Sequence, residues 1–332
     1  MKATDKQATF EIESLRQPVQ NDIEAVDALI VKELSSHVPL IETITHHIIQ
    51  SGGKRLRPLV VLLTARACGY EQDVEHQELA TVIEFIHTAT LLHDDVVDKS
   101  TQRRGQKTAN ALWGNSASVL VGDFLYSRAF QILARRSNVP IMKILATTTN
   151  QISEGEVWQL MNQNDPDIDE VTYYEVIRRK TAQLFSAAAE IGAIVATKNE
   201  TWQKSMAAFG LHLGMAYQII DDLLDYSKDA SALDKNVGDD LAEGKATLPL
   251  IYAKQQAQPA QAEHIREAIK NGDLDDLQSI MKLMDETRAR EYTQQCALTQ
   301  AEKAHTYLQQ LPPSPYRDAL NALTQFVVSR HY

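Results

Sequence analysis

Apolar residues recur at helical spacing along most of the chain, and strict alternation of apolar and polar residues is nowhere sustained. Such stripes run through residues 23–30 and 40–49, and residues 59–67 are apolar nearly throughout, which is typical of a buried helix. The stripes are interrupted at few places, namely residues 51–53, 68–70, 164–166, 258–259 and 312–315. The pattern predicts an all-α fold, with a polar lead-in over residues 1–20 and a single helical domain over residues 21–332.

The composition supports helices and excludes several functional classes. Only 13 glycines and 10 prolines occur in 332 residues, so the chain has few of the signals that hairpins need. The 44 acidic residues outnumber the 33 basic ones and give a net charge of −11. Because such a surface repels a nucleic-acid backbone on average, we expect no nucleic-acid partner. Any phosphate chemistry therefore needs a local basic cluster or a metal.

The cysteines and the apolar runs bear on where the protein works. Cys68 and Cys296 are too few for a disulfide framework and suit a reducing cytoplasm. Residues 1–20 resemble neither a signal peptide nor a presequence, and apolar runs such as residues 59–63 are far shorter than the ~18 residues needed to cross a bilayer. We therefore expect a cytoplasmic protein.

A short acidic pattern occurs twice in apolar, helix-like sequence. Both copies read D-D-x-x-D, over residues 94–98 and 221–225. On a helix, the first and last carboxylates of this pattern lie one turn apart on the same face, where like charges repel. Apolar flanks would drive these carboxylates to protonate unless a cation binds them. Oxygen ligands without a set of histidines or cysteines favour Mg²⁺, which also takes substrate phosphates as ligands. Two such clusters facing each other would hold several ions around one polyphosphate.

Cationic residues gather around the acidic copies although the chain is acidic. Residues 52–58 read G-G-K-R-L-R-P, so that Lys54 and Arg57 lie in a turn before a helix, as in a diphosphate cradle. Arg103 and Arg104 follow the first acidic copy and can reach two different phosphate groups. Taken alone, a basic turn or a single acidic pattern is as often an ordinary solvent-exposed surface as a binding site. The combination favours a site.

Other polar residues accompany the acidic copies. His87 lies two helical turns before Asp94 and faces the same side, although a histidine in this setting is as often an ordinary core side chain. Further residues of this kind are Lys180, Thr181, Gln218, Lys235, Lys245, Asp239 and Asp240. The arrangement suits two polyanions, one held through metal and one through direct salt bridges.

The order and spacing of these motifs resemble those of the trans-isoprenyl diphosphate synthases over nearly the whole chain from about residue 25. The matching motifs are G-G-K-R-L-R-P, H-x6-D-D-x-x-D-x4-R-R-G, K-T, Q-x-x-D-D-x-x-D and G-D-D-x-x-x-G-K. The chain is most similar to the bacterial octaprenyl and polyprenyl diphosphate synthases that make quinone side chains. The resemblance implies an isoprenoid-synthase-type bundle of roughly ten or more helices around a deep central cavity, working as a homodimer.

The resemblance also implies the substrates and the role of each residue. The expected enzyme is a prenyltransferase that adds isopentenyl diphosphate to an allylic diphosphate, here farnesyl diphosphate, and makes octaprenyl diphosphate for the ubiquinone side chain. About three Mg²⁺ ions are expected per active site. The direct ligands would be Asp94, Asp98 and Asp221, supported by Asp95, Asp222, Asp225 and either Asp239 or Asp240. The allylic diphosphate would be held by Arg103, Lys180, Thr181, Gln218, Lys235 and Lys245. Isopentenyl diphosphate would be held by Lys54, Arg57, His87 and Arg104.

The expected chemistry needs no protein nucleophile. Mg²⁺ and the cationic side chains neutralise the leaving diphosphate, so that the allylic C–O bond ionises and the alkene of isopentenyl diphosphate attacks the cation. The departing diphosphate takes the final proton. Because water would quench the cation, we expect a lid, which we assign to residues 235–245. We also expect a transient membrane contact when the product leaves.

Product length is expected to depend on what closes the tunnel below the first acidic copy. Ala89 and Thr90, one turn before Asp94, are small and would let a growing chain pass. The wall is expected to continue through Ile86, Val82 and Ile83, with a floor at Phe130 or Met142. The alternative for Ala89 and Thr90 is ordinary packing between helices.

Three other functions compete with this one. His93 beside Asp94, with His46 and His47 upstream, could indicate a His-Asp metal phosphohydrolase, which would need a histidine-rich metal shell. A class I terpene cyclase also ionises its substrate with D-D-x-x-D, but its second metal motif normally contains Asn, Ser or Thr, and Glu. The third alternative is a non-catalytic partner subunit, a class that tends to lose the acidic motifs.

Overall fold

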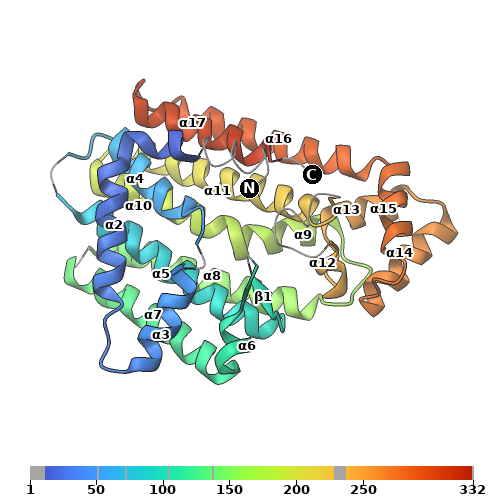
Figure 1. Cartoon of the computed structure of the whole chain (residues 1–332). Helices are drawn as coiled ribbons and strands as arrows, with labels where there is room; N and C mark the ends of the chain where they lie inside the picture. The colour runs from blue at the N-terminus through green and yellow to red at the C-terminus, as the bar shows by residue number, and fades with distance from the viewer. Residues whose placement is uncertain are drawn as a thin grey trace. The chain divides into compact units, whose positions relative to one another are not determined.

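The computed structural model describes residues 12–50, 52–71, 73–103, 105–136, 138–227 and 237–330. Within these ranges nearly all regular structure is helical (Figure 1), which confirms the expected all-α fold. The described exception is a two-stranded antiparallel hairpin, β1 (Gln102–Arg103) and β2 (Gln106–Lys107). None of the helices in the described ranges is both long enough and apolar enough to span a bilayer.

The chain groups into two compact units. Unit 1 comprises the residues up to Thr149, Leu184–Gly210 and His305–Phe326, and unit 2 comprises Asn150–Gln183, Leu211–Ala304 and the residues from Val327 onward. The single domain expected over residues 21–332 stays a prediction. The helices that begin in unit 1 are η1 (Gln17–Val19), α2 (Gln20–Glu33), α3 (Pro39–Gln50), α4 (Leu56–Ala67), α5 (Glu75–Val97), α6 (Ala109–Trp113), α7 (Asn115–Arg136), α8 (Val139–Met161), α11 (Glu200–Leu224) and α17 (Pro315–Val328).

The elements that begin in unit 2 include a short π-helix. They are α9 (Glu170–Ile177), the π-helix η2 (Arg178–Ala182), α10 (Gln183–Ala196), α12 (Asp239–Ala242), α13 (Leu248–Gln256), α14 (Pro259–Asn271), α15 (Leu277–Glu286) and α16 (Ala289–Leu308). The helix ends follow local sequence. At the start of α14, Gln258 and Gln261 form a reciprocal capping box around Pro259, and at its end Gly272 adopts the left-handed conformation that glycine favours.

Helix α5 lies at the centre of unit 1 and carries the first acidic motif at its end. It packs against α2, α4 and α7. The apolar stretch that the sequence predicts as a buried helix forms most of α4, in which residues 59–63 are almost completely buried. Each such Leu or Val side chain stabilises the fold by about 1.5–3 kcal/mol relative to exposure. This packing fixes α5 against α4.

The chain before α2 is also packed onto unit 1. Residues 12–16 are helical, and Ile12, Leu15 and Val19 are buried within the segment that the sequence suggests is a polar lead-in. Residues 1–11 lie outside the described residues. Immediately before α4, Arg55 has a positive φ of 43°, a conformation that non-glycine residues seldom adopt, and its side chain pairs with Asp27.

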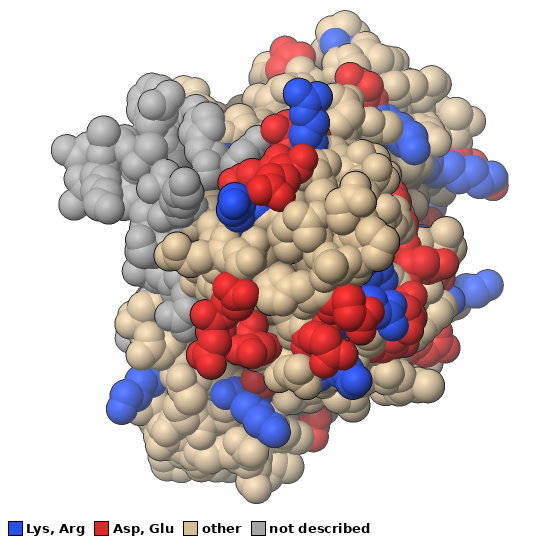
Figure 2. All heavy atoms as spheres, turned by 90° about the vertical axis from the view of Figure 1, so that its right-hand side faces the viewer, with Lys and Arg blue, Asp and Glu red and all other residues tan. Residues whose placement is uncertain are grey.

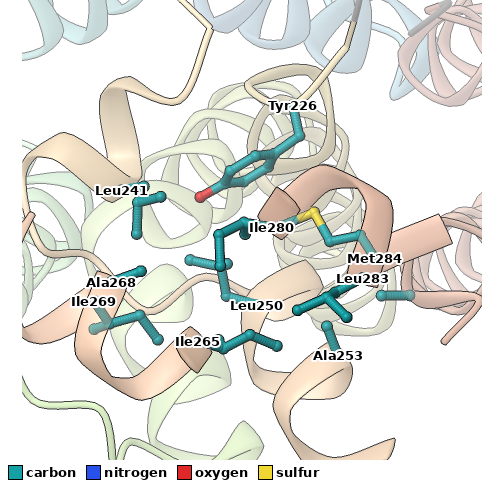
Figure 3. Close-up of a cluster of buried hydrophobic side chains, with 11 residues drawn as sticks. Tyr226, Leu241, Leu250, Ala253, Ile265, Ala268, Ile269, Ile280, Leu283 and Met284 are labelled. Atoms are coloured by element: carbon teal, nitrogen blue, oxygen red, sulfur yellow. The ribbon is translucent and has the colours of Figure 1, made fainter. Parts of the chain in front are cut away.

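Unit 2 has a hydrophobic cluster of its own, in which α13, α14 and α15 meet (Figure 3). Tyr226 belongs to this cluster and directly follows the second acidic motif, with its ring beside Leu241 and Ile280 (Figure 3). The motif is therefore anchored at its end by a buried aromatic side chain. Figure 2 shows several groups of acidic side chains on one face of the molecule, in keeping with the net negative charge.

Candidate active site

The first acidic motif divides into two half-buried carboxylates and one buried one. Asp94 and Asp98 lie one turn apart at the end of α5, where the Asp98 amide donates to the Asp94 carbonyl at 2.8 Å. Asp95 is 1% exposed. Its Oδ1 accepts hydrogen bonds from Nε and Nη2 of Arg103 at 3.0 and 2.8 Å. Asp95 therefore pairs with Arg103 inside the protein, whereas Asp94 and Asp98 lie on the more accessible side of the helix.

The β1–β2 hairpin brings Arg103 back to the helix that precedes it. Burial raises the pKa of the Asp95 carboxyl, and the positive charge of Arg103 acts in the opposite direction. Asn110 ties the same place together, because its amide donates to the carbonyls of Asp95 and Ser100, both at 3.0 Å. Arg104, the second arginine of the pair, lies outside the described residues.

Two of the residues expected at the isopentenyl diphosphate site are in direct contact. Nη1 of Arg57 lies 3.1 Å from Nε2 of His87, which joins α4 to α5. The guanidinium of Arg57 also lies over the ring of Phe185, 4.4 Å from its centroid. Lys54 lies over another ring, that of Phe326, at 5.1 Å. All of these residues belong to unit 1.

The second acidic motif, at the end of α11, has one half-buried carboxylate and two buried ones. Asp222 and Asp225 are buried, whereas the side chain of Asp221 is 29% exposed. Nη1 of Arg330 lies 3.6 Å from Oδ1 of Asp221. Oδ2 of Asp225 accepts from the backbone amide of Asp240 at 3.1 Å, so the two inner carboxylates organise the protein around the outer one.

A chain of hydrogen bonds holds Asp222. The Tyr173 hydroxyl donates to its Oδ2 at 2.6 Å, and the Gln218 amide donates to its Oδ1 at 2.6 Å. The Thr181 hydroxyl donates in turn to Oε1 of Gln218 at 2.8 Å. Burial, followed by the nearby negative charge of Asp240, raises the pKa of the Asp222 carboxyl. Gln218 and Thr181, both expected at the allylic diphosphate, are thus linked to the acidic motif.

A polar cavity of about 120 Å³ opens beside this network in unit 2. The predicted site residues on its wall are Lys180, Thr181, Gln218, Asp222, Asp240 and Lys245. Asp240 lines this cavity, and its backbone amide donates to Asp225. The choice between Asp239 and Asp240 as a support for the metal stays open. Lys235 and the residue after it lie outside the described residues, whereas the rest of the lid assigned to residues 235–245 is described and contains α12. Its role as a lid stays a prediction.

The π-helix presents Lys180 to the cavity. A wider turn of this kind often occurs at functional sites. Nζ of Lys180 donates to Oε2 of Glu156 and Oε1 of Gln159, both at 2.7 Å. Helix α8 can lie this close to the π-helix because residue 155 is glycine. A Cβ at this position would lie 2.9 Å from Cβ of Arg179 and 3.0 Å from the Lys180 amide nitrogen. The ammonium group is therefore held in one place.

A family model described as polyprenyl synthetase matches residues 38–286. The chain belongs to the polyprenyl synthetase family. It is 48% identical to octaprenyl diphosphate synthase of Escherichia coli K12 over 320 residues, which are 96% of this chain and 99% of that protein. The recognised family and the enzyme class, a prenyltransferase of the polyprenyl diphosphate synthase type, are therefore confirmed.

Solved structures of the polyprenyl synthetase family match the fold. The crystal structure of a decaprenyl diphosphate synthase from Rhodobacter capsulatus matches with a TM-score of 0.91 at 44% identity, over 96% of this chain and 98% of that one. A polyprenyl synthase from Caulobacter crescentus CB15, complexed with calcium and isoprenyl diphosphate, matches with a TM-score of 0.92 at 41% identity, with the same two coverages. The expected isoprenoid-synthase-type fold is confirmed, while the roles of individual residues remain predictions.

The donor atoms of the acidic motifs fit a hard divalent cation. The more accessible oxygens are carboxylates of Asp94, Asp98 and Asp221, which is the ligand type that Mg²⁺ prefers. Within the described ranges, no group of three or more His, Cys, Asp or Glu side chains is already gathered as a metal cage.

The histidines that suggest a phosphohydrolase have structural partners. Nε2 of His47 is 2.8 Å from the Lys107 carbonyl, and Nε2 of His93 is 3.2 Å from the Val119 carbonyl. Family membership and these contacts favour the synthase over the phosphohydrolase.

The residues assigned to the tunnel lie in unit 1. Ala89 and Ile86 on α5 are completely buried, as are Val82 and Ile83. The Thr90 hydroxyl donates to the His87 carbonyl at 2.8 Å. On α7, Phe130 contacts the ring of Tyr126 at 5.9 Å, and Met142 on α8 is half-buried. Their role in product length stays a prediction.

Several residues that contact the predicted site residues within each unit were not predicted from the sequence. Tyr173 lies seven positions, two helical turns, before Lys180, a spacing that could have drawn attention to it. The sequence gives no signal for Glu156, Phe185 and Phe326, because each lies in a helical pattern typical of an ordinary surface or core residue. Arg330 is 109 positions from Asp221, so no local pattern could link them.

Proposed function

We propose that this polyprenyl synthetase is an octaprenyl diphosphate synthase, which extends farnesyl diphosphate with isopentenyl diphosphate for a quinone side chain. The observation that carries the proposal is the polar cavity in which Lys180, Thr181 and Lys245 accompany the second acidic motif. Its mixture of cations, amide and carboxylates suits a metal-bound diphosphate. The product length rests on the 48% identity to the octaprenyl enzyme. A decaprenyl product, the length named for the Rhodobacter relative, is the alternative.

The diphosphate groups would be bound by residues of this chain. Asp94, Asp98 and Asp221 would ligate Mg²⁺, which when bound neutralises charge on the leaving diphosphate. Nζ of Lys180 and the Lys245 ammonium would bind the same diphosphate directly. The buried carboxylate of Asp222 would hold Gln218 in position.

The second substrate would be bound by the basic residues around the start of α4. Lys54 and Arg57 would bind the diphosphate of isopentenyl diphosphate, and His87 would orient Arg57 through the 3.1 Å contact. This contact needs Nε2 of His87 to accept and therefore Nδ1 to carry the proton. Arg104 and Lys235 are included in this proposal on the sequence resemblance alone.

We also propose a homodimer in the cytoplasm. Large apolar side chains remain exposed along the middle helices of the chain, where a second copy could cover them. They are Leu112, Val119, Leu120, Val157, Leu160 and Met161. The buried free thiol of Cys68 suits a reducing compartment. Light scattering of the purified protein tests the dimer, and a monomer at micromolar concentration would contradict it.

The decisive experiment combines purified protein, Mg²⁺, farnesyl diphosphate and labelled isopentenyl diphosphate, followed by sizing of the extracted lipid. Octaprenyl diphosphate and inorganic diphosphate are the expected products. Asp94→Asn is the matched inactive control, because it removes a metal ligand charge with little change in volume. Decaprenyl product would correct the length, free monophosphate would indicate a phosphohydrolase, and absence of any conversion by the wild type would indicate the non-catalytic subunit.

A further inference from the structure

Lys54, in the turn before α4, and Arg57, in the first turn of α4, each lie over a phenylalanine ring that comes from a distant part of the sequence. Arg57 lies over Phe185 of α10, with 4.4 Å between the guanidinium carbon and the ring centroid. Lys54 lies over Phe326 of α17, with 5.1 Å between Nζ and the centroid. A cation over an aromatic face is attracted by the negative face of the ring, most strongly where water is excluded.

The contact with Phe185 restrains the Arg57 guanidinium, whose carbon lies 4.4 Å from the ring centroid. Its N–H donors form a planar fork that can bind a diphosphate at two points. Nη1 is directed to Nε2 of His87 at 3.1 Å, which restrains the group a second time. A ring and a histidine together therefore define the orientation of the fork that would receive a diphosphate.

Phe185 is itself rigidly placed. It is completely buried, and a Cβ added at Gly210 would lie 2.2 Å from its carbonyl oxygen, so α11 and α10 touch backbone to backbone here. The next residue, Ser186, donates to the Ala207 carbonyl at 2.9 Å. The position of the ring follows from this close contact between helices, since only glycine fits there.

The contact with Phe326 links the turn to the last helix. Phe326 is 6% exposed, and the turn is held on its other side by Arg16, whose Nη2 donates to the Lys54 carbonyl at 2.9 Å. Side chain and backbone of Lys54 are thus fixed by two different elements. The flexible four-carbon stem of lysine makes such support useful where a defined position is needed.

From these contacts we infer that Phe185 and Phe326 are positioning residues of the isopentenyl diphosphate site, each setting the orientation of one cation. The inference rests on the proposed function, because it takes Lys54 and Arg57 as the groups that bind this substrate. The rings would touch the cations and not the substrate. Their loss would therefore weaken binding of isopentenyl diphosphate and leave the allylic substrate and the chemical step unaffected.

The test is steady-state kinetics of Phe185→Leu, which keeps a large apolar side chain and removes the ring. The KM for isopentenyl diphosphate is expected to rise roughly tenfold, whereas kcat and the KM for farnesyl diphosphate change less than about twofold. Phe209→Leu, which removes an equally buried ring from α11, is the matched control and should not raise this KM selectively. An equal rise for both substrates, or the same rise in the control, would overturn the inference.

A double-mutant cycle tests the contact itself. In an Arg57→Gln background, Phe185→Leu is expected to lower kcat/KM by less than about twofold, because the ring has no cation to orient. A tenfold loss in both backgrounds would show that the ring acts independently of Arg57. If Phe185→Leu does not fold, Phe326→Leu gives a separate answer through Lys54, with an expected rise in the same KM of about threefold.

Calorimetric titration with isopentenyl diphosphate separates this inference from the proposed function. If the wild type binds isopentenyl diphosphate and the Phe185→Leu variant binds it more weakly, the inference is supported even when neither protein elongates a substrate. Unchanged affinity in the variant overturns the inference while an active wild type leaves the proposed function standing.

Discussion

The hydroxyl oxygen of Tyr173 lies 2.6 Å from Oδ2 of Asp222, and both side chains are buried. A tyrosine and a carboxylate in such a place stabilise each other, because a buried carboxylate without donors is costly. The bond joins α9 to the end of α11, next to the Asp221 carboxylate that we propose as a metal ligand. Tyr173 therefore stabilises the buried middle carboxyl of the second acidic motif.

Tyr173→Phe removes this hydroxyl with little change in shape. We expect it to destabilise the protein by about 1–3 kcal/mol, because the buried Asp222 carboxyl loses a hydrogen-bond donor in the interior. We also expect a several-fold higher Mg²⁺ concentration at half-maximal activity. Urea denaturation and a Mg²⁺ titration of activity measure the two effects. Tyr174→Phe, at the neighbouring position, is the control, and equal behaviour of the two variants would show that Tyr173 has no special part.

Gly155→Ala should displace Lys180. The added Cβ would lie 2.9 Å from Cβ of Arg179 and 3.0 Å from the Lys180 amide nitrogen, so α8 and the π-helix would have to separate. We expect the KM for farnesyl diphosphate to rise by about tenfold, which corresponds to about 1.4 kcal/mol. Thr147→Ala, an exposed change on the same helix, should have no effect. An unchanged KM in Gly155→Ala would mean that the close contact does not position the lysine.

Asp22 makes acid stability depend on a buried ion pair. Hydrogen bonds from His76, Arg66 and Gln77 lower its pKa below the usual range, against the effect of burial. A carboxyl with a lowered pKa in the folded state stabilises the protein above its unfolded pKa of about 3.9 and loses this effect as the pH falls further. Asp22→Asn should cost about 1–3 kcal/mol at pH 7, because the half-buried guanidinium of Arg66 loses its carboxylate partner.

Urea denaturation between pH 7 and pH 3 measures this dependence. The difference in unfolding free energy between wild type and Asp22→Asn should shrink as the pH falls below about 4. Asp275→Asn, at an exposed position, should follow the wild type at every pH. A difference that stays constant to pH 3 would contradict the assignment of the pH effect to Asp22.

Ala89→Phe tests the tunnel wall. If Ala89 borders the growing chain, the ring blocks it within one helical turn of Asp94, and products should shorten to about three or four isoprene units. If the completely buried Ala89 only packs between helices, the larger side chain should instead cost about 1–3 kcal/mol through overpacking and leave the product length unchanged. Product sizing and thermal unfolding distinguish the two. Full-length products would show that the wall lies elsewhere.

The sequence was most informative where spacing and chemistry coincide. Helical periodicity predicts the all-α fold, and the one-turn separation of Asp94 and Asp98 follows directly from the geometry of a helix. The family followed from the order of motifs, since no single motif is specific enough. These features are local, so a residue and its close neighbours contain the necessary information.

The rest depends on contacts between segments far apart in the chain. Nothing near Phe326 indicates a cation, and nothing near Arg330 indicates Asp221, because the fold alone brings them together. The π-helix around Lys180 was equally unpredictable, since its sequence is compatible with an ordinary α-helix. The burial of the middle carboxylate in both motifs depends on Arg103 in one case and on Tyr173 in the other.

Arg55, directly between Lys54 and the start of α4, has a left-handed backbone conformation that lowers the stability of the fold but fixes the shape of the turn. A non-glycine residue in this conformation costs roughly 1 kcal/mol or more, a cost that glycine would not carry. The chain nevertheless has arginine there, anchored to Asp27. A more stable protein with glycine at this point would have a looser turn. Arginine at this position lowers the folding stability slightly, but it gives the turn a defined shape before any ligand binds.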